Sequence, residues 1–234
     1  MEQHRGLVVH LKDKDLWFHE SVVNSWVILI VLSILCVIIY NKIKKADPLE
    51  KPTGLLHIVE ILVEAIDGLV IQTMGKRNLK FAPYMLSLGM FLACANLWGL
   101  LGFTPPTSDY NVTLALALIT FVMIHFYSFK TKGAGGYFKQ FAEPMFILTP
   151  INIIGEIANP ISLSFRLFGN VLSGALIMSL VYQGLSKLSS FLIPIVAAPL
   201  HAYFDVFAGV LQTFIFLMLS MTYISSNMAE EEEN

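Results

Sequence analysis

Long stretches with almost no charge dominate this sequence and limit the folds that it can adopt. Between residues 144 and 186 only Glu156 and Arg166 carry charge, and the last apolar stretch carries only Asp205. Charged residues make up 14% of the chain, against about 25% in a typical soluble domain. Because roughly 20 apolar residues cross a bilayer as a helix, the pattern predicts an all-α integral membrane protein. The sequence has no basic stripe, so a nucleic-acid partner is not expected.

The apolar runs predict five transmembrane helices in a single membrane domain over residues 1–234. Three runs are short, and two are long. As helices, the long runs would measure about 63 Å and 58 Å, so each is either a re-entrant pair of helices or one long tilted helix. The expected bounds are 21–41, 80–103 and 111–130 for the short spans, 145–186 and 189–227 for the long ones, 1–20 for an exposed N-terminal tail and 228–234 for an acidic tail.

A sixth helix is expected between the first two spans, at residues 54–74. His57, Glu60, Glu64 and Asp67 recur there at helical spacings of three and four. Such a pattern is typical of an amphipathic helix that lies at the membrane interface. The acidic face is either solvated or directed toward a partner or an aqueous ion path.

Lysine and arginine residues set the expected orientation. They gather in the loops after the first span, before the second and after the third, and short loops rich in these residues stay cytoplasmic. With five spans, the N-terminus is predicted to lie outside and the C-terminus in the cytoplasm.

Polar residues form one track along each of the two long runs. Two long helices joined by a short turn pack antiparallel, so the two tracks are expected to meet. The first track, read at helical spacing, consists of Asn152, Asn159, Ser162, Arg166, Asn170 and Ser173, with Glu156 on its flank; the second consists of His201, Asp205, Gly209 and Gln212.

Arg166 is the costly member of these tracks. A charged residue at the centre of a membrane helix costs roughly 2.5 to 3.5 kcal/mol. Arg166 could form a structural ion pair with Asp205 or Glu156. Alternatively, it lies in an ion pathway, where a permanent positive charge lowers the pKa of a nearby carboxyl group and blocks a direct cation leak. Glu156, Asp205 and His201 would then be the titratable relays.

The segment from Ser164 to Asn170, read SFRLFGN, resembles the signature of subunit a of F-type ATP synthases. Further matching segments are PPTSDYN at 105–111, PIN at 150–152 and PISL at 160–163, together with Gln212 in the last run. The resemblance covers nearly the whole chain in order. It implies a membrane stator beside a rotating ring of c subunits, with the two long helices tilted against that ring as an antiparallel hairpin.

The same resemblance implies the role of several residues. Arg166 matches the essential arginine that faces the ring and separates two offset half-channels, and Asn170 and Gln212 match polar residues near it. Many members carry an acid nine residues after the arginine, where this chain has Ala175. Our hypothesis is that Asp205 replaces this acid in the outer half-channel, while Asn152, Glu156 and Asn159 line the inner one.

The expected partners are the c-subunit ring, the peripheral-stalk b subunits, the rest of the complex and the lipid of a bacterial inner membrane. No nucleotide motif, cofactor or metal site is predicted, so the chain is expected not to be catalytic alone. The sequence leaves the identity of the ion, H⁺ or Na⁺, open, because the selective site would lie on the ring. Two other functions are a secondary transporter that binds an anion at Arg166 and a structural scaffold. The transporter class usually shows internal repeats, and the polar tracks argue against a scaffold.

Overall fold

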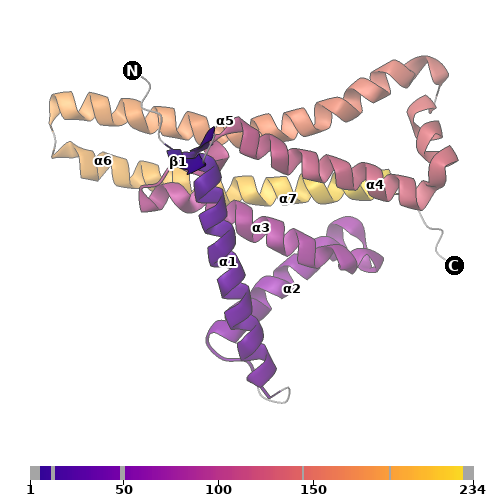
Figure 1. Cartoon of the computed structure of the whole chain (residues 1–234), viewed down its shortest axis with the longest axis horizontal. Coiled ribbons are helices and arrows are strands. Elements are labelled where there is room, and N and C mark those ends of the chain that lie inside the picture. Colours follow the sequence, from indigo (N-terminus) through magenta and orange to yellow (C-terminus); the bar gives the residue numbers. More distant parts are fainter. Residues whose placement is uncertain (1–5, 12–13, 48–50, 144, 190, 229–234) are drawn as a thin grey trace.

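The computed structural model describes residues 6–11, 14–47, 51–143, 145–189 and 191–228, and nearly all of them are helical (Figure 1). Five helical segments are long and apolar enough to cross a membrane, which confirms the predicted number of spans. These segments are Glu20–Lys45, Lys76–Leu101, Tyr110–Ala142, Phe146–Lys187 and Leu192–Asn227. The predicted acidic tail lies outside the described residues beyond residue 228.

An antiparallel ribbon precedes the first span, in the stretch expected to form an exposed tail. Strand β1 (Gly6–Leu11) pairs with β2 (Lys14–His19), so that Gly6 lies opposite His19. The sequence pattern did not predict these strands, because six-residue runs give only a weak alternation signal. Helix α1 (Glu20–Lys45) follows at once, with the His19 side chain accepting a hydrogen bond from the Ser21 amide at its N-terminus.

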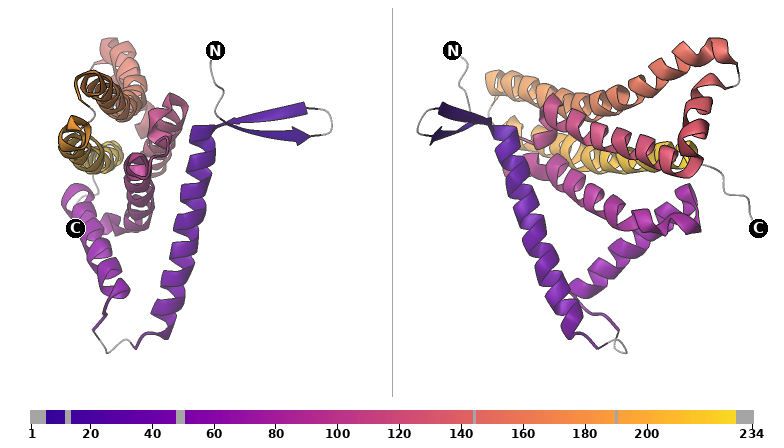
Figure 2. Two further views of the ribbon diagram at one scale, coloured as in Figure 1. Left: turned by 90° about the vertical axis from the view of Figure 1, so that its left-hand side faces the viewer. Right: turned by 45° about the vertical axis from the view of Figure 1, so that its right-hand side comes forward.

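Helix α1 is attached to the rest of the protein mainly through its N-terminal end. The Ser21 hydroxyl donates to Asp109 Oδ2 at 2.6 Å, and the Asn24 amide donates to the Thr104 carbonyl at 2.9 Å. Burial raises the pKa of Asp109, but the hydrogen bonds from Ser21 and Asn111 and the nearby His19 together bring it below its usual value. Figure 2 shows α1 extending from this junction along the side of the bundle.

Helix α2 (Leu55–Met74) packs against α3 (Ala82–Leu97) and α7 (Ala208–Asn227). Glycines with positive φ, Gly54 and Gly75, flank it, and both turns need that freedom. Its acids Glu60 and Glu64 are exposed. Short 3₁₀ segments at Lys76–Phe81 and Trp98–Leu101 extend α3 at both ends.

A third span, α4 (Tyr110–Ala142), follows the 3₁₀ turn Pro106–Ser108. We expected this span to end at residue 130, but the chain stays helical to Ala142 apart from a break at Gly133. This residue has φ +69° and ψ 173°, a conformation that glycine adopts without the steric penalty of a side chain.

The two long apolar runs are each helical over most of their length. After a 3₁₀ turn at Phe146–Leu148, α5 (Thr149–Leu188) continues for 40 residues, with Pro160 inside it. The second run consists of α6 (Leu192–His201), a π-helical turn (Ala202–Phe207) and α7, in unbroken succession. Figure 1 shows α6 and α7 running alongside α5 in the opposite direction, and α5 contacts both.

The core lies where α2, α3, α4, α5 and α7 meet. Fully buried side chains from these helices include Val70, Met85, Leu92, Ile124, Leu167, Phe216 and Ile224. Polar groups cross-link the same helices. The Asn96 amide of α3 donates to the Gly209 carbonyl at 3.2 Å and to the Thr213 hydroxyl at 3.0 Å. Helices that pack in lipid lack a hydrophobic driving force between them, so such contacts help to fix their positions.

Candidate functional site

Arg166 lines a hollow between α5 and the helix that follows the π turn. We call it the Arg166 hollow; its volume is about 520 Å³. Helix α5 supplies Arg166, Asn170 and Ser173, and α7 supplies Gln212. The remaining lining residues are Phe165, Gly169, Tyr203, Phe207, Ala208, Leu211 and Ile215. The two polar tracks of the sequence therefore do meet here, in the part that surrounds the arginine.

The Arg166 guanidinium makes no hydrogen bond or ion pair with any residue in the described part of the chain. Arg166 is exposed on the surface of the molecule. The structure therefore does not contain the ion pair between Arg166 and Asp205 or Glu156 that was one of the two alternatives from the sequence. An unpaired charge inside a membrane is costly.

Gln212 reaches the hollow from a buried position. It is only 4% exposed, and its Nε2 has no hydrogen-bond partner among the described residues. A buried amide without a partner costs about 1 to 3 kcal/mol. Asn96 bonds the backbone of Gly209, three residues before Gln212, and the side chain of Thr213, the residue after it. Helix α3 therefore fixes the turn of α7 that carries Gln212. Asn170 and Ser173 are exposed, and Ser162 is exposed outside the hollow.

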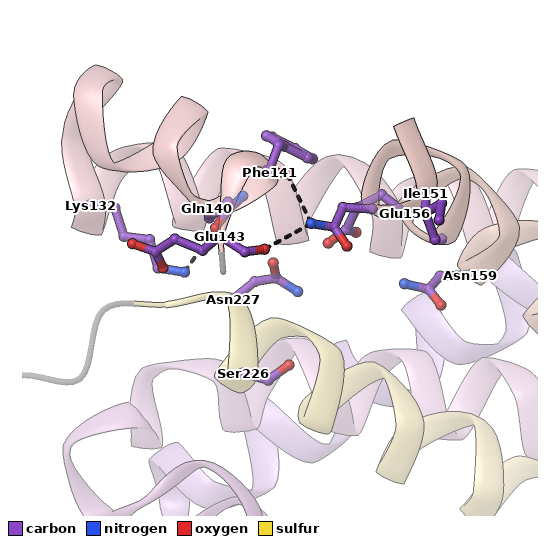
Figure 3. Close-up of a pocket in the computed structure, with 11 residues that line it drawn as sticks. Lys132, Gln140, Phe141, Glu143, Ile151, Glu156, Asn159, Ser226 and Asn227 are labelled. Atoms are coloured by element: carbon purple, nitrogen blue, oxygen red, sulfur yellow. Dashed lines mark hydrogen bonds between the residues drawn. The ribbon is translucent and has the colours of Figure 1, made fainter. Parts of the chain in front are cut away.

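A second hollow lies at the N-terminal end of α5, where α7 ends (Figure 3). We call it the Glu156 hollow; its volume is about 580 Å³. Three predicted site residues, Asn152, Glu156 and Asn159, line it. The other lining residues are Lys132, Gln140, Phe141, Glu143, Ile151, Gly155, Ser226 and Asn227. The Asn152 amide donates to the Phe141 and Glu143 carbonyls at 2.8 and 3.0 Å, and this fixes the start of α5 against the end of α4.

Glu156 has neighbours that the spacing of residues along the sequence does not reveal. Its Oε2 is buried without a hydrogen-bond partner among the described residues. His125 and Tyr137 of α4 are close enough to Glu156 to interact with it electrostatically. They also bond each other, with the Tyr137 hydroxyl 3.1 Å from His125 Nδ1. Only the fold brings α4 and α5 into this register, so spacing along the sequence gives no sign of this electrostatic interaction.

The remaining predicted residues, His201 and Asp205, lie toward the turn between α5 and α6. His201 Nδ1 is 2.5 Å from Asp205 Oδ2, and His201 Nε2 is 2.7 Å from the Tyr182 hydroxyl. Neither residue lines the Arg166 hollow. Tyr182 was missed. It lies in the last two turns of α5 and His201 at the end of α6, and residues placed in this way can face each other in an antiparallel pair of helices.

Comparison with known proteins assigns this arrangement to a family. The family described as ATP synthase A chain matches residues 22–225, which include Arg166, Glu156, His201 and Asp205. The chain belongs to the ATP synthase A chain family. Its members form part of the membrane sector of ATP synthase, so this chain is a multi-pass inner-membrane component of a complex that couples ion transport to ATP synthesis.

Relatives in the ATP synthase A chain family share about a third of the sequence. The sodium-ion-specific ATP synthase subunit a of Propionigenium modestum is 38% identical over 189 residues, covering 74% of this chain and 63% of that relative. The chain thus spans less than two thirds of that protein's length. ATP synthase subunit a of Trichlorobacter lovleyi is 31% identical over 228 residues, covering 95% of this chain and 92% of the relative. ATP synthase subunit a 3 of Pelobacter propionicus is 33% identical over 216 residues, covering 90% and 88%.

Proposed function

We propose that this chain is the ion-translocating stator subunit of an F-type ATP synthase. In this proposal two offset half-channels lead ions to and from the carboxylates of a rotating c ring, and Arg166 separates the half-channels. The chain is not catalytic alone; ATP chemistry belongs to other subunits. The observation that carries the proposal is the Arg166 guanidinium, which is exposed, unpaired among the described residues and surrounded by Asn170, Ser173 and Gln212.

An arginine suits this role because it stays protonated at physiological pH. Its charge favours the ionised form of a carboxyl group that comes close. The counter-ion would therefore be a ring carboxylate that arrives and leaves as the ring turns. Large apolar side chains beside Arg166, including Phe165, Phe207 and Leu211, are exposed, and an apolar helix face of the ring could cover them.

The positions of the other polar groups support two half-channels. The Glu156 hollow lies ten residues before Arg166 on α5, about 15 Å away at helical rise. Tyr182, the partner of His201, lies 16 residues after it, about 24 Å away. With the N-terminus outside, the Glu156 hollow opens to the cytoplasm, and the His201–Asp205 pair belongs to the outer path. Asp205 then supplies the acid that Ala175 does not.

The remaining parts of the proposal concern the surroundings of the chain. Helices α5 and α6–α7 would lie tilted against the ring as an antiparallel hairpin. Helix α2 would lie at the membrane interface with Glu60 and Glu64 toward water, in keeping with their exposure. The peripheral-stalk b subunits would bind elsewhere on the chain.

The test compares Arg166→Ala with Arg77→Ala in the complete ATP synthase complex, reconstituted into vesicles. Both variants remove one arginine, but Arg77 lies in the 3₁₀ segment before α3, away from the hollow. Arg166→Ala should lower ATP-driven ion uptake roughly 100-fold or more, the effect of removing one preorganised electrostatic group, and Arg77→Ala should retain uptake. Copurification with an oligomeric c ring should be unchanged. Normal uptake in assembled Arg166→Ala would refute the role of the arginine.

A further inference from the structure

The ring of Tyr110 packs against the turn of α5 that carries Arg166. Its centroid is 4.8 Å from that of Phe165, with the two planes 34° apart, and 5.8 Å from that of Phe168, at 74°. These phenylalanines stand one residue before Arg166 and two residues after it. We call the three rings the Tyr110 cluster. Tilted and edge-to-face contacts of this kind are favourable arrangements for aromatic pairs.

The Tyr110 cluster touches a different side of α5 from the side that faces the core. The core holds this turn through three buried residues, Leu163, Ser164 and Leu167. At roughly 100° per residue they lie about 60° to 160° around the helix from Arg166, while Phe168 and Phe165 lie at about 200° and 260°. The core and the cluster therefore hold two adjacent sides of α5, and Arg166 is left on the remaining side, where the hollow opens.

The cluster lies where α5 exchanges one neighbouring helix for another. Tyr110 is the first residue of α4. Farther along α4, Ile124 lines a narrow gap together with Pro160 of α5, which precedes Arg166 by six residues. After Arg166, α5 contacts α6 and the π-helical turn. Tyr110 therefore marks the end of the support that α4 gives to α5, at the turn that carries the arginine.

The start of α4 is itself anchored, so the Tyr110 ring is held in place from behind. Asp109 caps the helix, since its Oδ1 accepts a hydrogen bond from the Asn111 amide at 2.9 Å. Its Oδ2 accepts a hydrogen bond from the Ser21 hydroxyl of α1 at 2.6 Å. The Thr113 hydroxyl donates to the Tyr110 carbonyl at 3.0 Å, and the 3₁₀ turn before α4 packs against both α1 and α5. The ring is thus connected to three helices.

We propose that Tyr110 is a positioning residue for Arg166, because the Tyr110 cluster fixes the rotation of α5 and keeps the guanidinium in the Arg166 hollow. This inference rests on the proposed ion-translocating function. The Tyr110 hydroxyl bonds no residue in the described part of the chain, so the role belongs to the aromatic ring. A guanidinium favours the ionised form of a carboxyl group only when it is close. A rotated α5 would therefore uncouple ion movement from ATP hydrolysis.

The test compares two substitutions of Tyr110 in the complete ATP synthase complex, reconstituted into vesicles. The measured quantity is the number of ions taken up per ATP hydrolysed, because a mere loss of assembled complex lowers both rates equally and leaves this ratio unchanged. An aromatic pair shifts an equilibrium roughly 2- to 12-fold, so Tyr110→Leu should lower the ratio roughly 2-fold or more. Tyr110→Phe keeps the ring and should keep the wild-type ratio. The matched control is Tyr40→Leu on α1, where the tyrosine is 65% exposed; its ratio should equal that of the wild type.

A second measurement follows the rotation of α5 directly. A Cβ placed on Gly174 would lie 3.6 Å from the Phe204 Cβ of the π-helical turn, a separation that suits a disulfide. In a chain with Gly174→Cys and Phe204→Cys, and with both native cysteines replaced by alanine, oxidation should cross-link α5 to this turn. Adding Tyr110→Leu should slow the cross-linking, and adding Tyr110→Phe should not.

The outcomes separate the positioning role from the proposed function. An unchanged ion-to-ATP ratio or an unchanged cross-linking rate in Tyr110→Leu would overturn the positioning role. So would an equal loss in Tyr110→Leu and Tyr110→Phe, because the ring would then not be the part that matters. Undiminished ion uptake in Arg166→Ala would instead overturn the proposed function on which this inference rests.

Discussion

Replacing Asn96 provides a sensitive test of how the bundle positions Gln212. The Asn96 amide connects α3 to α7 through the Gly209 carbonyl at 3.2 Å and the Thr213 hydroxyl at 3.0 Å. Interhelical hydrogen bonds in membrane proteins contribute about 0.6 kcal/mol on average, so the two bonds together contribute about 1 kcal/mol. The Thr213 hydroxyl still donates to the Gly209 carbonyl at 3.0 Å, and no carbonyl loses its last partner.

Two substitutions separate hydrogen bonding from packing. Asn96→Leu keeps the branching and the number of side-chain heavy atoms, and should lower the free energy of unfolding by about 1 kcal/mol, the contribution of the two bonds. Asn96→Ala also leaves a cavity at a residue that is 5% exposed, and should lower the free energy by roughly 2 to 3 kcal/mol in total. The expected order of stability is therefore wild type, then Leu, then Ala.

The measurement is reversible unfolding of the chain in mixed detergent micelles. Asn41→Ala is the control, because Asn41 is exposed on α1, and such a change should stay within about 0.5 kcal/mol. A second readout is ion uptake by the assembled complex, which should fall more for Ala than for Leu because Gln212 loses its support. If both Asn96 variants unfold within 0.5 kcal/mol of wild type, the bonds do not hold α7, and the reasoning is refuted.

Other predictions concern the outer junction, helix packing and the outer acid. The pKa of Asp109 in the folded protein lies below its ordinary value of 3.8. The stability that its carboxylate contributes is therefore present above pH 3.8 and is lost as the pH falls through the folded pKa. The difference in free energy of unfolding between the wild type and Asp109→Asn should shrink in acid, and a constant difference would contradict this. Gly89→Ala should lower the free energy of unfolding by about 1 to 3 kcal/mol, because the new Cβ would lie 2.9 Å from Leu217 Cδ1. At Gly68 a new Cβ meets no atom within 4 Å, so Gly68→Ala should raise the free energy of unfolding by about 0.5 to 1 kcal/mol. Asp205→Asn should lower ion uptake while the complex still assembles; intact uptake would show that Asp205 is not the outer acid.

The hydrophobic pattern was sufficient to predict five spans, because long uncharged runs have few alternatives to a membrane helix. It was not sufficient near Gly133, where glycines and lysines indicate a loop but the helix of α4 resumes after one residue with positive φ. Helical periodicity also placed Arg166, Asn170 and Ser173 on one face, which the Arg166 hollow retains. These are local properties of one helix.

Contacts between helices depended on information that periodicity does not contain. The sequence by itself determined that Arg166 is a charge within an apolar helix and that polar residues accompany it, because composition and a 3.6-residue period are local. Only the tertiary structure decided that Arg166 has no partner among the described residues, that Tyr182 completes a hydrogen-bonded chain with His201 and Asp205, and that His125 interacts electrostatically with Glu156. The physical reason is that helix register and rotation are set by side-chain packing between segments far apart in the chain.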